Sequence, residues 1–178
     1  MSLMNKGISN FRDLRSDEID VRVASVNEKG ASLLLYKDAR CDMNILDETV
    51  GPLNWKRGHT RENANCIVSI WDETKGEWIS KEDTGTESFT EKEKGLASDS
   101  FKRACFNWGI GRELYTAPFI WVSADKLKIY TKNAKPAVSD SFYVEKIKIV
   151  DKKIIAISIK NNRGERVFVK APEGKNEG

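Results

Sequence analysis

Residues 90–111 carry the clearest structural signal in the chain, the segment TEKEKGLASDSFKRACFNWGIG. Thr90 followed three residues later by Glu93 matches a capping box, the reciprocal pairing of side chains and backbone that begins many helices. Apolar residues then recur at spacings of three and four, which places them on one helix face: they are Ala97, Phe101, Ala104, Cys105 and Trp108. We therefore predict an amphipathic helix that begins after Thr90 and for which Gly109 and Gly111 are candidate terminators.

The segment before this helix predicts three short strands, over residues 54–61, 65–71 and 77–82. The middle stretch alternates apolar side chains between two faces, with the period of two that a strand requires. Residues 72–76 join the second and third strands as a hairpin loop that ends in glycine. The three strands are therefore expected to form an antiparallel meander that packs against helices.

On the N-terminal side, residues 1–18 are polar and are expected to form a loose arm. Alternation over residues 19–26 predicts a strand, which the Glu28-Lys29-Gly30 run ends. From Ala31 to Val50 the apolar residues recur at helical spacing, and Gly51-Pro52 follows them. We predict a first helix over that stretch.

On the C-terminal side, residues 119–122 fit either a strand or a buried turn, and residues 131–140 have the composition of a linker. Three further strands are predicted over 142–150, 154–160 and 165–170, before a polar tail. We therefore expect an α+β protein with a DNA-binding and oligomerisation core in residues 1–130. A C-terminal β-meander with a disordered tail would occupy residues 131–178.

Bulk composition excludes little by itself. The 178 residues include 30 Lys and Arg against 27 Asp and Glu, so any nucleic-acid argument depends on where the charges lie. The three cysteines are far apart and there is one histidine, which predicts free thiols in a reduced compartment and no zinc site. The sequence shows no signal peptide and no run of about 20 apolar residues, so a soluble, cytoplasmic protein is expected.

Enzyme motifs are missing, since the chain has no phosphate-binding glycine loop and only His59 as a potential imidazole base. We expect no catalysis and no cofactor. Acidic residues around the hairpin nevertheless leave a metal-dependent nuclease as an alternative: they are Asp72, Glu77, Glu82, Asp83 and Glu87. A protein-interaction module that does not bind DNA is the other alternative.

Basic and aromatic residues gather on the predicted helices and first meander strand. The cations are Lys37, Arg40, Lys56, Arg57, Lys102 and Arg103, and the aromatic residues interleaved with them are Tyr36, Trp55, Trp71 and Trp78. If both helices pack on one sheet, the cations could line a groove that follows the phosphates of a single strand. Exposed rings could stack on bases, although Trp71 and Trp78 could instead simply pair across their hairpin.

Residues 91–115 resemble the signature helix of the Rad fifty-two family. That helix begins with charged residues, continues into an Ala-x-x-x-x-Lys-Arg-Ala core, and closes with an aromatic-Gly pair and an aliphatic-Tyr pair. The corresponding residues are Ala97, Lys102-Arg103-Ala104, Trp108-Gly109 and Leu114-Tyr115. The resemblance extends over about residues 15–122, through the first helix, the meander and Asp83-Thr84-Gly85. The short chain is similar to the phage and prophage branch.

This resemblance implies an ATP-independent protein of DNA recombination and repair, which anneals complementary strands as a ring or helical oligomer. Lys102 and Arg103 match the basic pair that contacts the DNA backbone, Arg40 matches a third groove residue, and Lys94 matches a residue of an outer DNA site. Phe106 stands where the family often has another basic residue, so Lys56 or Arg57 would have to supply that contact with DNA. Expected partners are single-stranded DNA, further copies of the chain, and a host or phage single-strand-binding protein or exonuclease.

Overall fold

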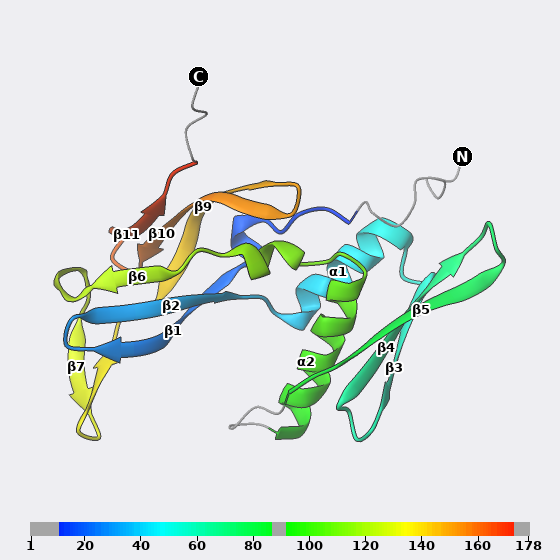
Figure 1. Ribbon diagram of the computed structural model, residues 1–178, viewed down its shortest axis with the longest axis horizontal. Coiled ribbons are helices and arrows are strands. Elements are labelled where there is room, and N and C mark those ends of the chain that lie inside the picture. The colour runs from blue at the N-terminus through cyan, green and yellow to red at the C-terminus, as the bar shows by residue number, and fades with distance from the viewer. Residues whose placement is uncertain (1–10, 87–91, 173–178) are drawn as a thin grey trace. The chain divides into compact units, whose positions relative to one another are not determined.

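The computed structural model describes residues 11–86 and 92–172, with only the backbone of residues 92–94 (Figure 1). This part of the chain contains two α-helices and eleven strands whose pairings are antiparallel, so the predicted α+β class is confirmed. It forms two compact units. The first comprises Met1–Asp13 with Ala39–Gly111, and the second comprises Leu14–Asp38 with Arg112–Gly178.

The first unit contains the predicted three-stranded meander, in the order β3 (Trp55–Thr60), β4 (Asn65–Asp72) and β5 (Glu77–Thr84). Alternation and a short glycine-ended turn specify this hairpin geometry locally, which explains why it was predictable. Helix α2 (Lys92–Asn107) packs on one face of the sheet (Figure 1). The indole N–H of Trp108 donates a hydrogen bond of 3.0 Å to the Val68 carbonyl, which joins the helix end to the central strand.

The predicted apolar stripe of α2 forms the core of this unit. Phe101, Ala104 and Cys105 are fully buried and Trp108 nearly so, and the helix ends before Gly109, whose φ of 99° suits glycine. Thr90 lies outside the described residues and Glu93 has no described side chain, so the capping box stays a prediction. Neither α-helix in the described part of the chain has the length and apolar character needed to cross a membrane.

The predicted helix over residues 31–50 is wrong in its first part. Helix α1 spans Ala39–Val50, whereas residues 30–36 form strand β2 (Gly30–Tyr36). This strand pairs with β1 (Asp20–Asn27) on one side and with β6 (Ile120–Ser123) on the other. Tertiary pairing on both edges outweighed a short run of helical spacing, which is how context commonly overrides local propensity.

The second unit is built around a six-stranded sheet in the order β11-β10-β9-β1-β2-β6. The predicted C-terminal meander is present as β9 (Phe142–Val150), β10 (Lys153–Asn161) and β11 (Arg166–Lys170). Strand β9 pairs with the N-terminal strand β1 through Asp20 and Tyr143. Because this sheet combines both ends of the chain, the division between the units does not coincide with the boundary expected at residue 130.

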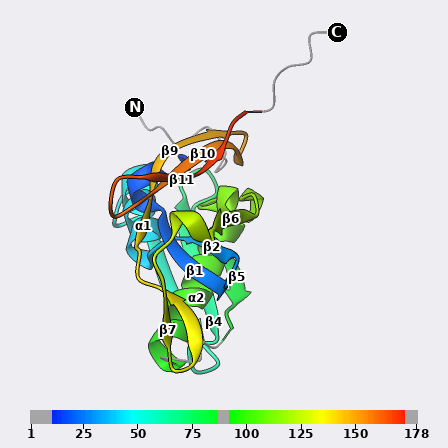
Figure 2. The ribbon, with the colours of Figure 1, turned by 90° about the vertical axis from the view of Figure 1, so that its left-hand side faces the viewer.

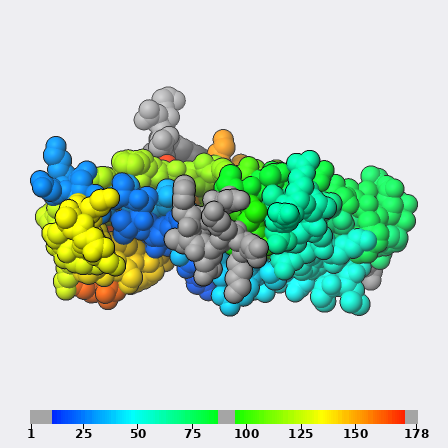
Figure 3. Space-filling model, turned by 90° about the horizontal axis from the view of Figure 1, so that it is seen from below, coloured from blue at the N-terminus to red at the C-terminus, as the bar shows by residue number. Residues whose placement is uncertain are grey.

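Residues 131–140, predicted as a linker, largely form a hairpin of β7 (Ile129–Lys132) and β8 (Lys135–Val138). Asn133 and Ala134 have φ values of 51° and 61°, the positive pair required by a tight hairpin turn whose twist matches its strands. The hairpin is a two-stranded sheet of its own, drawn in yellow at the bottom of Figure 2. In Figure 3 it forms a yellow surface patch beside the blue β1 and β2 strands.

The expected loose arm is wrong for residues 11–18, while residues 1–10 lie outside the described part of the chain. Phe11 and Leu14 are buried, in the first and second units respectively. The backbone N–H of Leu14 donates a 2.6 Å hydrogen bond to the carboxylate of Glu113, which is also fully buried. Phe11 and Leu14 therefore anchor this polar segment. Two isolated apolar residues are a weaker sequence signal than the periodic pattern of a strand or a helix.

Candidate nucleic-acid interface

The meander has two different faces. Side chains alternate along β3, so Trp55, Arg57 and His59 point toward α2 while Lys56 points to the opposite side. The strand register shows which other side chains of the sheet lie on the same side as Lys56. The residues on this side include Lys56, Thr60, Ser69, Trp71, Trp78 and Ser80. We call this surface the open face.

An aromatic and cationic cluster lies on the open face. Trp71 and Trp78 occupy opposite positions of the β4–β5 hairpin, with ring centroids 5.5 Å apart in an edge-to-face arrangement. The alternative that they pair across the hairpin is therefore confirmed. The Lys56 ammonium lies 4.2 Å from the centroid of the Trp78 ring, and 37% of Trp78 remains exposed.

This cluster has the chemistry needed to bind a nucleotide. An exposed indole face can stack on any base, since every base has a π surface, and an adjacent ammonium can pair with the phosphate of the same strand. The hydroxyls of Ser69 and Ser80 form a 2.8 Å hydrogen bond on the same face. Glu82 lies farther along β5, where it accepts a 2.9 Å hydrogen bond from Asn65 and adds one negative charge to that end.

Two predicted site residues lie on the other face, against α2. The Trp55 ring stacks on Phe101 with centroids 6.1 Å apart, and its N–H donates a 2.6 Å hydrogen bond to Asp47. The Arg57 guanidinium lies 4.7 Å from the centroid of the Phe101 ring and is otherwise exposed. Trp55 therefore packs the helix against the sheet, while Arg57 carries its charge at the edge of that interface.

The titratable groups beside Arg57 are held in their neutral forms. Burial, with a smaller contribution from the Arg57 charge, lowers the pKa of His59 below its usual value. Ser100 Oγ lies 3.4 Å from His59 Nδ1, within hydrogen-bonding distance. Burial raises the pKa of the Cys66 thiol to about 11, against the opposing effect of Arg57. At neutral pH this region therefore presents a neutral imidazole, a thiol and one guanidinium charge.

The Lys102-Arg103 pair lies on α2, where consecutive residues are about 100° apart around the axis. Arg103 points toward β5, with Nε 3.7 Å from an Asp83 carboxylate oxygen. Asp83 also accepts hydrogen bonds from the Thr84 backbone and from Asn107. The Arg103 charge is thus partly compensated, and Lys102 projects from a different side of the helix.

Lys81 is a cation near α2 that the sequence did not single out. Its ammonium donates a 3.0 Å hydrogen bond to the Asn107 carbonyl and lies 4.9 Å from the Trp108 ring centroid. A cation at a helix C-terminus satisfies a carbonyl that has no partner within the helix. Its position on β5, two residues before Asp83 and so on the same sheet face, was the available sequence signal.

The remaining predicted residues are spread over both units. Arg40 is exposed on α1 of the first unit, whereas Tyr36 and Lys37 belong to the second unit. The prediction that Lys37 and Arg40 share one side of a helix is wrong, because Lys37 precedes α1 and is buried. The Arg22 guanidinium lies 5.6 Å from the Tyr36 ring centroid. The Lys94 side chain lies outside what the structure describes.

The acidic residues considered for a metal site are distributed along the β4–β5 pair. Asp72 and Glu77 are opposite each other beside the turn, and Asp83 pairs with Cys66 near the other end. Glu87 lies outside the described residues. Within residues 11–86 and 92–172, no three His, Cys, Asp or Glu side chains gather as a metal ion would require.

The structure therefore brings Lys56 together with Trp78 and Trp71, Arg57 together with Trp55, and Arg103 together with Asp83. Comparisons of the chain with protein-family models, with curated proteins and with solved structures find no match.

Proposed function

We propose that this chain binds single-stranded DNA and, as an oligomer, anneals complementary strands without ATP. The observation that carries the proposal is the exposed Trp78 ring with the Lys56 ammonium 4.2 Å from its centroid, on the face of the meander opposite α2.

Stacking on an exposed ring contributes about 1–3 kcal/mol per base and is tolerant of sequence. A lysine beside the ring supplies a phosphate contact whose strength falls as salt concentration rises. The Lys56–Trp78 arrangement thus supports binding to a strand whose bases are unpaired, because a base within a duplex has no free face to offer the indole.

The basic residues of α2 give the proposal a second support. Lys102 and Arg103 match the DNA-contacting pair of the Rad fifty-two family, and both are partly exposed. Contacts to the backbone leave base edges available, so an incoming complementary strand reads the sequence while the protein does not. Oligomerisation would repeat these weak contacts along one strand and raise affinity through effective concentration.

The experiment is annealing of two complementary fluorescent oligonucleotides without ATP, together with light scattering on a size-exclusion column. Acceleration by a multi-subunit species is expected. Lys102→Ala with Arg103→Ala should weaken single-strand binding about tenfold or more and reduce its salt dependence. The matched control is Lys132→Ala with Lys135→Ala, on the β7–β8 hairpin of the second unit. A monomer that does not accelerate annealing would contradict the proposal.

A further inference from the structure

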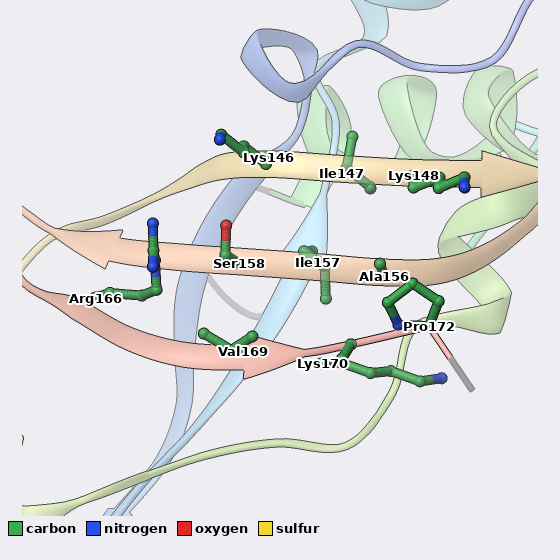
Figure 4. A pocket seen from close by; sticks show the side chains of 11 residues that line it. Lys146, Ile147, Lys148, Ala156, Ile157, Ser158, Arg166, Val169, Lys170 and Pro172 are labelled. Atoms are coloured by element: carbon green, nitrogen blue, oxygen red, sulfur yellow. The ribbon is translucent and has the colours of Figure 1, made fainter. Parts of the chain in front are cut away.

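A hollow of about 460 Å³ lies on the outer surface of the β9–β10–β11 meander (Figure 4). Four cationic side chains from two of its three strands contribute to the lining: they are Lys146, Lys148, Arg166 and Lys170. The sequence signal was the two-residue spacing of Lys146 and Lys148 along β9, which directs both side chains to one face of the sheet.

The floor of the hollow is apolar. Val169 is 58% exposed, and Ala156 and Pro172 also line the cavity. Lys146, Ser158 and Val169 occupy one row across the three strands, which places the ammonium, the hydroxyl and the isopropyl group side by side. Such a concave surface with an apolar floor and a charged rim is suited to a ligand that combines both characters.

Glu145 organises one end of the rim. Its carboxylate accepts hydrogen bonds of 2.7 and 2.8 Å from Arg166 and one of 2.9 Å from Ser158. It also forms an ion pair of 2.9 Å with Lys160. This bidentate contact fixes the Arg166 guanidinium, which stays half exposed. One carboxylate therefore serves two cations on this surface.

The other rim cations have no such compensation. In the part of the chain that the structure describes, no carboxylate lies within ion-pair distance of Lys146, Lys148 or Lys170. A concentration of like charge around a low-dielectric floor produces a positive potential that attracts anions.

Two kinds of polyanion have to be distinguished. A single-stranded nucleic acid needs aromatic rings on which its bases stack, and none of the described residues that line this hollow is aromatic. An acidic peptide needs cations for its carboxylates and an apolar recess for a hydrophobic anchor. The cationic rim and the apolar floor of the hollow match the requirements of an acidic peptide.

We propose that the hollow on β9–β11 is a docking site for an acidic segment of another protein, held by its carboxylates on the lysine rim and by an apolar side chain over Val169. This site is separate from the open face of the β3–β5 meander, and the proposal does not rest on the DNA-binding proposal.

The test is fluorescence anisotropy of the full chain with a labelled peptide of alternating Asp and Glu that ends in Leu-Phe. Lys146→Glu with Lys148→Glu should weaken peptide binding about tenfold or more, because both exposed charges are reversed. Val169→Asp should weaken it by a similar factor. The matched control is Lys132→Glu with Lys135→Glu on the β7–β8 hairpin, which should bind the peptide within about twofold of the unmodified chain.

Each other outcome overturns the proposal. Equal weakening in the control pair would mean attraction to positive charge anywhere on the surface. Equal binding of a peptide ending in Ser-Ser would mean that the apolar floor is not used. Displacement of the peptide by oligothymidine, with weaker oligothymidine binding by the rim variant, would assign the hollow to nucleic acid. Absence of peptide binding would remove the site, whatever the annealing assay shows.

Discussion

Replacing Trp78 by alanine tests whether the open face of the meander holds single-stranded DNA. The variant removes one stacking surface, worth about 1–3 kcal/mol, and each 1.4 kcal/mol corresponds to about tenfold in affinity. Binding of a fluorescent oligothymidine should therefore weaken by about 5- to 150-fold. The slope of log affinity against log salt should not change, because the indole makes no phosphate contact.

The variant should stay folded. Trp78 is 37% exposed, and its edge-to-face contact with Trp71 contributes about 0.5–1.5 kcal/mol beyond burial. Its contact with Lys56 adds about 0.5–1 kcal/mol at an exposed site. These two contact terms are small beside the roughly 5–15 kcal/mol that separates folded from unfolded states in ordinary domains. Because 37% of Trp78 is exposed, the variant also loses less burial than the removal of a core tryptophan would.

Two companion variants make the result specific. Lys56→Ala should weaken binding and lower the salt slope by about 0.7, the value for one phosphate contact on a single strand. Phe119→Ala removes an aromatic side chain that is 78% exposed on the second unit and should leave binding unchanged. Unchanged binding by a folded Trp78→Ala, with binding lost in Lys102→Ala/Arg103→Ala, would refute the open face and assign the DNA to the α2 flank.

Three further predictions concern stability and reactivity. Phe101→Ala should lower the free energy of unfolding by about 3–5 kcal/mol, because the side chain is fully buried; urea unfolding measures this, and a loss below about 1 kcal/mol would contradict the core described. The partners of Glu145, Arg166 foremost and then Lys160, lower its pKa in the folded chain. The carboxylate of Glu145 therefore stabilises the folded chain at pH values above its pKa in the unfolded chain, about 4.3, and this contribution is lost as pH falls toward its pKa in the folded chain. The melting temperature should fall between about pH 5 and 3, and it should fall less in Glu145→Gln. Cys66, buried and with its pKa raised to about 11, should resist iodoacetamide at about pH 8 in the folded chain and react in urea; rapid labelling of Cys66 in the folded chain would contradict its burial.

The meander and α2 were predictable because their signals are local. Alternation over residues 65–71 and a glycine-ended loop determine a hairpin within a short stretch, and the stripe from Ala97 to Trp108 specifies the buried helix face. The Trp71–Trp78 contact follows from the same hairpin register. Short-range geometry alone determined these features.

Residues 31–36 and the β7–β8 hairpin were not predictable in the same way. Leu34 and Leu35 fit helical spacing, and only pairing with β1 and β6 makes their segment a strand. Asn133-Ala134 lacks the glycine that marks most tight hairpin turns. Pairing partners far away in sequence decided the first, and tolerance of positive φ at two ordinary residues decided the second.

Some features of the candidate sites were likewise determined by local sequence, and others by long-range packing. The sequence by itself determined that Lys56 lies on the opposite side of β3 from Trp55 and Arg57, and that Lys146 and Lys148 lie on one side of β9. Only the tertiary structure decided that Trp55 packs on Phe101, that Arg103 pairs with Asp83, and that Trp78 stays exposed beside Lys56. Alternation specifies the side of a strand on which a residue lies, but long-range packing decides which side α2 covers.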